Sequence, residues 1–152
     1  MKLEKLAAIS EIVSSIAIVV TLIYLAIQTQ QNTAAIQGTV RQSMLSEDRE
    51  ALYELIEHPS LELRCNLTSE QDTQLRAYMI AFLRMRENHW LQFRNGVVDE
   101  ATWRAYRQPL AGLIFDSEFG RSLWRAIRAG FDEGFARSGD ELLETTAVVP
   151  CE

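Results

Sequence analysis

The most extended pattern in the chain is a run of 29 residues, from Ile12 to Val40, that contains no charged side chain. Its first part, Ile12 to Ile27, reads IVSSIAIVVTLIYLAI and is almost wholly apolar, whereas Gln28 to Val40 is polar but uncharged. With the preceding flank from Leu6, the apolar part reaches 22 residues, which as a helix span roughly 33 Å at about 1.5 Å per residue. A hydrocarbon core is about 30 Å thick, so the pattern predicts a transmembrane anchor within residues 1–28.

Two other interpretations of the same run stay open. Lys2 and Lys5 resemble the positive start of a signal peptide, although no convincing A-x-A cleavage pattern follows Ile27. A β-branched core helix of a soluble protein, or a buried subunit contact, has the same composition. We favour the anchor, which places Glu11 about one turn inside the bilayer. There it either reaches the interface or contacts another transmembrane helix.

A candidate contact surface follows one side of the predicted anchor. Residues spaced by four, three, four and three positions share one stripe of a helix, and the stripe here holds Ser10, Ser14, Ala17, Thr21 and Tyr24. Small side chains permit close approach of helices in lipid, where apolar burial gives no drive to associate. The alternative is that such residues are simply common in membrane helices. The candidate transmembrane contacts, in a homo-oligomer or with a membrane protein partner, are Glu11, Ser14, Ala17 and Thr21.

The positive residues around the anchor indicate its orientation. Lys2 and Lys5 precede the anchor, and the next positive residue is Arg41. This distribution favours an N-terminus in the cytoplasm and a main domain on the other side of the membrane. Cys65 and Cys151 do not decide the compartment, because they can pair outside the cytoplasm and remain thiols inside it.

Beyond the anchor, apolar side chains recur with the 3.6-residue period of helices, and no alternating strand pattern of useful length occurs. The first helix is expected to continue through residues 29–58 as a neck and first bundle helix. Pro59 should end it, because the residue before a proline disfavours helical geometry. A short helical turn is expected over Leu61 to Cys65. The inward face of the first helix is predicted to hold Ile36, Val40, Met44, Ala51, Leu52 and Leu55.

Capping residues delimit three further helices. The predicted starts are Thr68 or Ser69 (with Gln71 in a capping box), Asp99 and Ser117. The first of these helices should end at Asn95-Gly96, the second should be kinked or divided by Pro109, and the last should end at Ser138-Gly139. The inward positions are predicted to include Leu75, Tyr78, Met79, Phe82, His89 and Phe93, then Trp103, Tyr106, Leu110, Leu113 and Ile114, then Phe119, Leu123, Ile127, Phe131 and Phe135.

These elements predict an all-α protein in which an N-terminal transmembrane helix continues into a small antiparallel helical bundle. Short connections favour antiparallel neighbours, and the bundle is assigned to residues 59–138. Residues 139–152 are predicted to form a C-terminal tail that partly folds back through Val148 and Val149.

The net charge of −6 conceals three segments of opposite sign. Residues 41–72 hold three Arg and eight acids, net −5, and residues 73–128 hold nine Arg and five acids, net +4. Residues 129–152 hold one Arg and six acids, net −5. A basic middle between acidic ends favours pairing within the bundle, and the excess of acids argues against a nucleic-acid partner.

No recognised pattern for catalysis or cofactor binding occurs in the sequence. There is no glycine-rich phosphate loop, G-x-S-x-G or H-E-x-x-H. Neither CxxC nor paired-His spacing supplies a zinc site, so we expect no metal and no cofactor. Glu54 and His58 share a helix face, but a surface pair is the simpler interpretation. Cys65 has no adjacent His or Lys to activate it, which favours an inert thiol.

The densest group of polar and aromatic residues lies around the predicted corner after Phe93. Its candidate interaction residues are Arg84, Glu87, His89, Arg94, Asp99 and Trp103. Arg84 and Glu87 are three residues apart and share a helix face, and Arg94 is expected to reach Asp99 or Glu100 across the turn. We interpret the group as a polar clasp that fixes the corner. The functional alternative is a ligand cleft or a contact with a partner.

The chain resembles a widespread family of uncharacterised bacterial single-pass membrane proteins with a small α-helical domain. Three segments carry the resemblance: LAAISEIVSSIAIVVTLIYLAIQTQQNT from Leu6, FRNGVVDEATW at Phe93–Trp103 and FGRSLWRAIRAGF at Phe119–Phe131. The resemblance implies a single-pass anchor in the bacterial inner membrane. It brings no activity, catalytic residue or ligand.

Two functional hypotheses follow from the sequence. The first is a non-catalytic, membrane-anchored helical interaction or scaffold subunit that contacts membrane lipid and either forms a homo-oligomer or binds a membrane protein partner. The second is a membrane-anchored sensor of a small molecule or lipid, with a cleft lined by Arg84, Glu87, His89 and Arg94. An enzyme is not expected, because no catalytic arrangement of residues was found.

Overall fold

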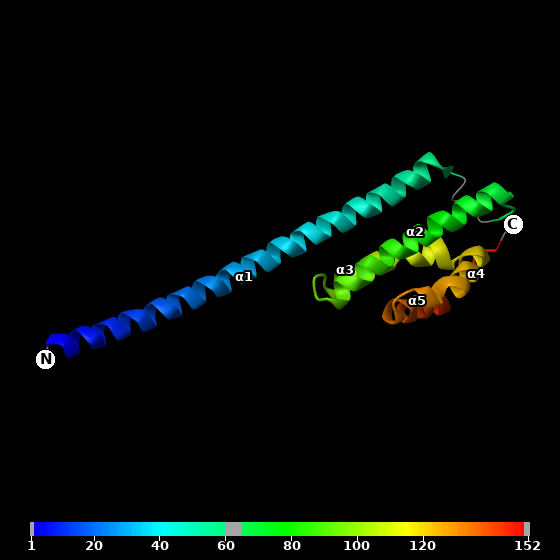
Figure 1. The fold of residues 1–152 in the computed structure, drawn as a ribbon. Coiled ribbons are helices and arrows are strands. Elements are labelled where there is room, and N and C mark those ends of the chain that lie inside the picture. Colours follow the sequence, from blue (N-terminus) through cyan, green and yellow to red (C-terminus); the bar gives the residue numbers. More distant parts are fainter. Residues whose placement is uncertain (1, 60–64, 151–152) are drawn as a thin grey trace. The chain divides into compact units, whose positions relative to one another are not determined.

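The computed structural model describes residues 2–59 and 65–150, with residues 2–9 described by their backbone alone. Every regular element in these residues is a helix (Figure 1), so the predicted all-α class is confirmed. The chain divides into two compact units, Met1–Val40 and Arg41–Glu152. The turn expected over Leu61 to Cys65 lies, apart from Cys65, outside the described residues.

Helix α1 runs from Lys2 to Glu57 and contains the whole charge-free run. Between Ile12 and Ile27 its large apolar side chains are exposed to at least 49% of their surface. The most apolar 18-residue window has a mean hydropathy of 2.1 and no buried residue. By length and composition α1 can therefore cross a membrane, a test that a signal sequence also passes.

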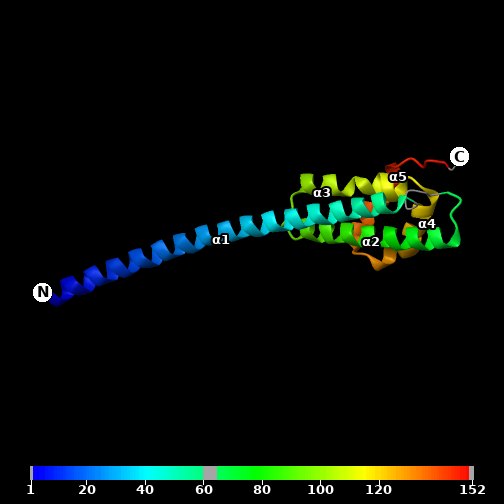
Figure 2. The same cartoon turned by 90° about the horizontal axis from the view of Figure 1, so that it is seen from above.

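The second unit begins with the last part of α1, Arg41–Glu57, which runs alongside α2, Ser69–Arg94 (Figure 2). The predicted capping box starts α2: Thr68 accepts from the Gln71 N–H at 3.3 Å, and the Gln71 side chain accepts from the Thr68 N–H at 2.9 Å. At the other end the chain turns through Gly96, whose φ of 72° is a conformation that side chains other than glycine rarely adopt.

The next two elements follow the predicted punctuation. Asp99 caps α3, Glu100–Arg107, by accepting from the Thr102 N–H at 2.7 Å. The helix predicted to begin at Asp99 is divided near Pro109, as expected from the missing N–H and the ring of proline. The chain then continues as a wide π-helical turn, η2, Ala111–Phe115, which was not predicted.

The predicted last helix is in fact two helices. Ser117 caps α4, Glu118–Ile127, as expected, but a short 3₁₀ turn, η3, Arg128–Gly130, follows it. Asp132 then caps α5, Glu133–Thr145. The helix period in the sequence continues across this break. The break is therefore not visible in the sequence, because Phe131 at the break and Phe135 after it keep the apolar spacing of one helix and are both buried.

The predicted helix end at Ser138-Gly139 is wrong, because α5 passes through both residues. Gly139 is needed for packing: a Cβ there would lie 2.6 Å from the Trp124 ring. The tail therefore begins after Thr145 and not at residue 139. The predicted return of the tail is confirmed for its backbone, since the Val149 N–H donates to the Asp116 carbonyl at 2.7 Å, although the Val149 side chain is 65% exposed.

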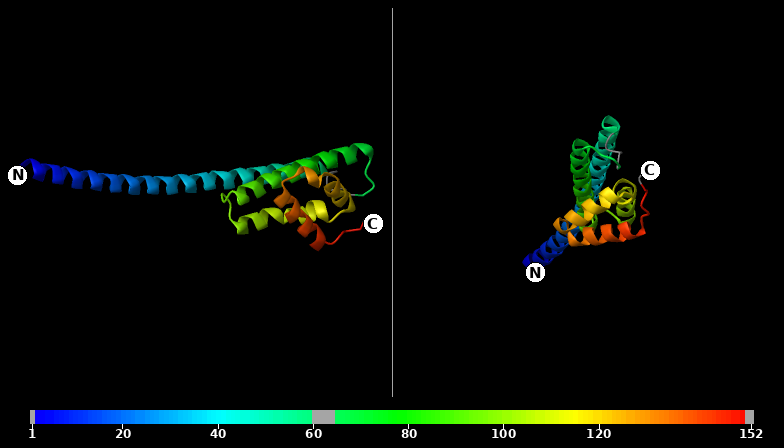
Figure 3. Two further views of the ribbon diagram at one scale, coloured as in Figure 1. Left: turned by 60° about the horizontal axis from the view of Figure 1, so that its bottom comes forward. Right: turned by 90° about the vertical axis from the view of Figure 1, so that its right-hand side faces the viewer.

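The core lies where α2 meets the short helices α3 to α5, which fold against one side of it (Figure 3). Predicted inward residues that are buried include Leu75, Met79, Phe82, His89, Trp103, Leu110, Ile114, Leu123, Phe131 and Phe135. On α1 the prediction is only half correct. Met44 is 1% exposed, whereas Ile36 and Leu52 are both 58% exposed, because an isolated helical stripe does not reveal where its neighbour ends.

Candidate functional site

Two polar clusters use different faces of the second half of α2. The observed clasp, hereafter simply the clasp, consists of Arg84, Glu87, Trp90 and Arg94 together with Gly130 of η3 and Asp132, the N-cap of α5; unlike the predicted clasp it does not include His89, Asp99 or Trp103. The buried network consists of Glu47, Asp48, Arg86 and His89, and it joins the last part of α1 to α2. Of the observed clasp the sequence predicted Arg84, Glu87 and Arg94, but as a clasp on the corner after Phe93 and not on the turn before α5. It missed most of the second cluster.

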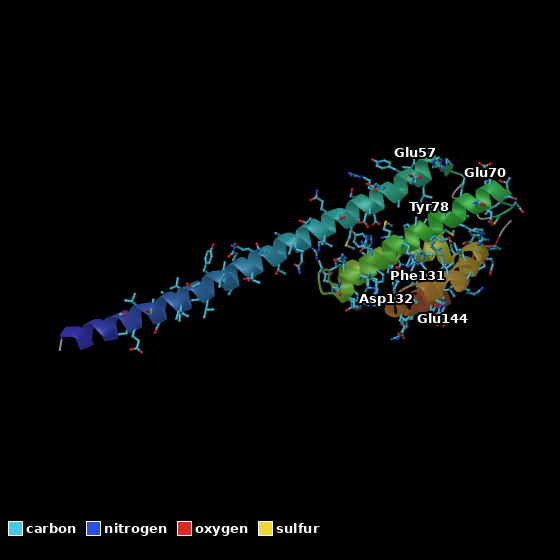
Figure 4. The ribbon with its side chains drawn as sticks, viewed as in Figure 1. Glu57, Glu70, Tyr78, Phe131, Asp132 and Glu144 are labelled. Carbon is cyan, nitrogen blue, oxygen red and sulfur yellow. The ribbon has the colours of Figure 1, made fainter. Side chains whose placement is uncertain are left out.

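The clasp is built on Asp132, which lies beside the C-terminal half of α2 (Figure 4). Its carboxylate accepts from the Trp90 indole at 2.9 Å and pairs with Arg94. The same carboxylate caps α5 by accepting from the N–H groups of Gly134 and Phe135. The Trp90 hydrogen bond, followed by the backbone donors and Arg94, holds the pKa of Asp132 below its usual value.

Arg84 and Glu87 complete the clasp from the same face of α2. Their side chains pair at 2.8 Å, as their spacing predicted. Arg84 also donates to the Gly130 carbonyl at 3.0 Å, and its guanidinium lies 4.1 Å from the centre of the Phe131 ring. Glu87 accepts from the Asp132 N–H at 2.6 Å. Together these bonds attach the turn between α4 and α5 to α2.

The predicted partners of Arg94 were wrong. Arg94 pairs with Asp132, which lies 38 positions away in the sequence, and not with Asp99 or Glu100. Asp99 instead pairs with Arg41 at 2.6 Å and caps α3, and Glu100 pairs with Arg104 within α3. Hydrogen bonding from Thr102 lowers the pKa of Asp99. The corner residues therefore separate, since α5 supplies a better-placed carboxylate.

Trp103 belongs to the core and not to a polar cluster. It is 4% exposed and lies among aromatic rings, with its ring centre 5.4 Å from that of Trp90 and 6.2 Å from that of Phe93. Trp103, predicted as an interaction residue, therefore packs beneath Trp90 and Phe93 and exposes little surface of its own.

His89 points away from the clasp and into the buried network. Its Nε2 lies 3.1 Å from Glu47 Oε2, and its Nδ1 lies 3.3 Å from Arg86 Nη1. A guanidinium can only donate, so Nδ1 is the acceptor and Nε2 carries the proton that His89 donates to Glu47. One neutral tautomer therefore satisfies both contacts.

Arg86 is the least expected member of the network, with only 2% of its surface exposed. Its Nη1 lies 2.8 Å from Asp48 Oδ1, and its guanidinium lies 4.5 Å from the centre of the Phe82 ring. The contact between Arg86 Nη1 and Asp48 Oδ1 is an ion pair that is not aligned as a hydrogen bond, and the Arg86 Nε has no hydrogen-bond partner among the described residues. The network therefore holds an ion pair whose hydrogen bonding is incomplete.

Burial dominates the protonation of the network. It lowers the pKa of His89, with the nearby Arg86 charge adding to the effect, and it raises the pKa of Asp48 despite Arg86. Burial also lowers the pKa of Arg86, although the Asp48 charge opposes the shift. The Tyr106 ring, edge-on to His89 at 4.9 Å, closes the other side, and burial raises the pKa of its hydroxyl.

A sequence signal for this network did exist. Arg86 lies four positions after Phe82 and three before His89, so it falls on the apolar face of α2. A charged residue on such a face predicts a buried partner of opposite sign. What the sequence lacked was any indication that Glu47 and Asp48, some 40 residues earlier, would supply it.

Two surface hollows adjoin these clusters. The arginine cleft, about 460 Å³, lies between the C-terminal end of α2, α3 and α5, and it is lined by Trp90, Phe93, Glu100, Trp103, Arg104, Arg107, Gly134, Arg137, Ser138 and Glu141. The acidic groove, about 390 Å³, lies between α1 and α2 and is lined by Glu47, Glu50, Ala51, Glu54, Tyr78, Ala81, Phe82 and Met85. The four residues of the predicted sensor cleft line neither hollow, since they are engaged in the clasp and the network.

The candidate transmembrane contacts lie exposed on α1. Ser14 and Thr21 donate to the carbonyls of Ser10 and Ala17, each at 2.8 Å, so their hydroxyls are satisfied within the helix. Glu11 and Ala17 are also exposed. Whether a partner helix covers them stays a prediction.

Cys65 is disulfide-bonded, which differs from the expected inert thiol. The only other cysteine of the sequence, Cys151, lies outside the described residues. Among the described residues no group of three or more His, Cys, Asp or Glu side chains is arranged to hold a metal ion. The pair predicted between Glu54 and His58 is present, with 3.9 Å between its atoms, and is exposed.

Comparison of the chain with protein-family models, with curated proteins and with solved structures yields no match. The family resemblance drawn from the sequence therefore stays a prediction, and the function rests on the geometry.

Proposed function

We propose that the protein is a non-catalytic, membrane-anchored helical interaction subunit whose partner is a second copy of the same chain in the same bilayer. The observation that carries the proposal is the set of apolar side chains that α1 leaves uncovered. These occur in two places, one in each unit.

The first place is the segment from Ile12 to Ile27. Eleven large apolar side chains there are exposed to between 49% and 64% of their surface, on every side of the helix. A helix that is apolar all round belongs inside a core or in lipid, and an exposed apolar area of this extent marks a contact surface. A lipid bilayer is the environment that covers all sides at once.

The second place is the outer face of Arg41–Glu57. Leu45, Leu52 and Ile56 are 62%, 58% and 71% exposed, while Met44 on a neighbouring face of the same helix is buried. Spacings of seven and four residues put the three exposed side chains in one stripe of the helix. The bundle leaves this stripe without a partner among the described residues.

A second copy suits this stripe because of how the anchor would orient it. Two copies inserted with the same topology have parallel α1 helices, so identical stripes face one another, as in a parallel coiled coil. Counted back along the sequence in alternating steps of three and four, the positions of Leu45 and Leu52 continue to Thr21, Ala17 and Ser14. The predicted small-residue contacts thus fall in the same sequence register.

The disulfide at Cys65 supports a location of the bundle outside the cytoplasm. Disulfides persist in oxidising compartments and are rare in the cytosol. The lysines before the anchor favour the same topology. A maleimide that does not cross membranes should therefore label the chain in intact cells after reduction, and labelling only after permeabilisation would contradict this orientation.

Light scattering of the full chain in lipid nanodiscs and in mild detergent tests the self-association. We expect a dimer that the double variant L52E/I56E shifts to monomer. V149E is the matched control, since Val149 is 65% exposed and belongs to the C-terminal segment and not to the stripe. A monomeric wild type at all concentrations, or stoichiometric recovery with a different protein from native membranes, would contradict a second copy as the partner.

A further inference from the structure

The arginine cleft combines two kinds of surface, aromatic rings and guanidinium groups. Its floor is aromatic, formed by the half-buried rings of Trp90 and Phe93 over the buried Trp103. Its rim carries three guanidinium groups, those of Arg104, Arg107 and Arg137, and two carboxylates, those of Glu100 and Glu141. Each of these guanidinium groups has a glutamate beside it, and the partner of Arg137, Glu133, lies just outside the lining.

The floor is held rigidly from beneath. Phe93 and Trp103 stack with only 11° between their ring planes, and Trp90 meets Trp103 edge-on. Trp90 is also fixed by its hydrogen bond to Asp132. Its ring packs closely against Gly134, where a Cβ would lie only 2.6 Å from it. A flat ligand thus meets a surface that is formed before it binds.

The three rim arginines differ in their freedom. Arg107 is fixed, because it donates to Ser138 at 3.0 Å and lies 3.7 Å from Glu141. Within the part of the chain that the structure describes, Arg104 and Arg137 each pair with the glutamate one turn earlier in their own helices and with no other carboxylate, and their side chains are 71% and 70% exposed. Exposed pairs of this kind are weak, so both guanidiniums are available to an incoming anion.

We propose that this cleft binds a small carboxylate that carries an aromatic ring system. Planar guanidinium groups match carboxylate geometry, and the aromatic floor accepts the ring. A volume of about 460 Å³ suits a two-ring molecule, and pockets with an apolar lining and few polar groups are typical of small-molecule sites. The proposal is independent of self-association through α1, which uses a different face.

Isothermal titration calorimetry with 2-naphthoate tests the proposal on the full chain in lipid nanodiscs, with empty nanodiscs subtracted. The two comparison probes are 2-naphthamide, which has the same rings without the charge, and decanoate, which has the charge without rings. We expect 2-naphthoate to bind at least tenfold more tightly than either. Quenching of tryptophan fluorescence should accompany saturation, because Trp90 lines the cleft.

The double variant R104Q/R137Q should weaken binding of 2-naphthoate at least tenfold while leaving the circular dichroism spectrum and the urea midpoint unchanged. R125Q is the control, since Arg125 is exposed on α4 and does not line the cleft. Three outcomes would overturn the proposal: no saturable binding of 2-naphthoate, equal affinity for 2-naphthamide or decanoate, or an equal loss of affinity in R125Q. A monomeric chain that still binds 2-naphthoate would leave this site intact while removing the proposed dimer.

Discussion

The clasp and the buried network begin from two arginines that are two residues apart on α2 and end with opposite energetics. Arg84 and Arg86 each lie 2.8 Å from a carboxylate, but their side chains are 51% and 3% exposed. The equal distances conceal the difference. In water the attraction is screened and each partner stays hydrated, whereas in the interior both the attraction and the cost of an unpaired charge are much larger.

The two clusters also differ in how completely their polar atoms are satisfied. In the clasp Asp132 receives donors from an indole, a guanidinium and two backbone N–H groups. In the network Arg86 Nε has no acceptor among the described residues. The loss of one contact should therefore destabilise the clasp only slightly. In the network, the loss of one member leaves a buried polar or charged group without its partner and should weaken the attachment of α1 to α2.

The largest effect is expected from removing Arg86. R86M leaves Asp48 without its ion-pair partner and the ring of His89 without its donor, and breaking a buried pair in this way costs about 3–5 kcal/mol. Urea unfolding of the full chain in detergent, followed by tryptophan fluorescence, measures the loss. The matched variant R84M should cost about 1 kcal/mol or less. Equal losses in the two variants would remove the distinction between the clusters.

Within the clasp the largest effect should come from Glu87, whose side chain is only 15% exposed. E87A removes the acceptor of the Asp132 N–H and the partner of Arg84, for an expected loss of about 1–2 kcal/mol in the same unfolding experiment. E87Q keeps an acceptor for the N–H and should recover part of that loss. If E87Q were as unstable as E87A, charge and not hydrogen bonding would hold the turn.

The network should also make stability depend on pH. The unfolded chain protonates His89 near its ordinary pKa of 6.5, whereas burial lowers that pKa in the folded protein. As pH falls through about 6.5 the unfolded state binds more protons, so the free energy of unfolding decreases. The raised pKa of Asp48 has the opposite effect, because it makes the folded state bind a proton more readily than the unfolded state. This increases the free energy of unfolding only at acidic pH, as the pH falls toward 3.8, the ordinary value for this carboxyl group.

Urea midpoints measured from pH 7.5 to 5 test this dependence. We expect H89Q to flatten the decrease, because it removes the buried titrating group. H58Q is the control, since the chain has only two histidines and the His58 side chain is 61% exposed. A decrease that H89Q leaves unchanged would contradict its origin in the buried network.

The smallest effect is expected at Arg94, whose side chain is 52% exposed. R94Q leaves the Trp90 indole and the capped N–H groups to satisfy Asp132, so the urea midpoint should stay within experimental error. Added salt should likewise change little, because an exposed pair is already largely screened. A clear destabilisation by R94Q would show that the clasp depends on charge in the same way as the network.

The accuracy of the sequence predictions follows the distance over which each interaction acts. The capping box at Thr68, the caps at Asp99 and Ser117 and the division at Pro109 were all correct, since each depends on residues within one or two turns. The break before α5 was missed although Asp132 is a good cap, because the apolar period continued through it. The function of Gly139 was missed because its reason is the ring of Trp124, fifteen positions earlier.

The candidate site shows the same limit. The pairing of Arg84 with Glu87 is local to one helix and was predicted. The other predicted interaction residues do not stay with this pair, because the fold places them in different contacts. Arg94 found Asp132, and His89 found Glu47. Neither partner is identified by spacing, since a carboxylate 38 or 42 residues away competes on equal terms with the many acids elsewhere in the chain.

The sequence by itself determined the all-α class, the charge-free apolar run of α1 and most helix starts, because these depend on composition, period and adjacent donors and acceptors. The tertiary structure alone decided which side of α2 each charge occupies, that Arg86 is buried against Asp48, and that aromatic rings and arginines meet in one cleft between α2, α3 and α5. The physical reason is that burial and long-range pairing depend on which surfaces come together. In this chain the two acidic ends offer several partners to every arginine between them.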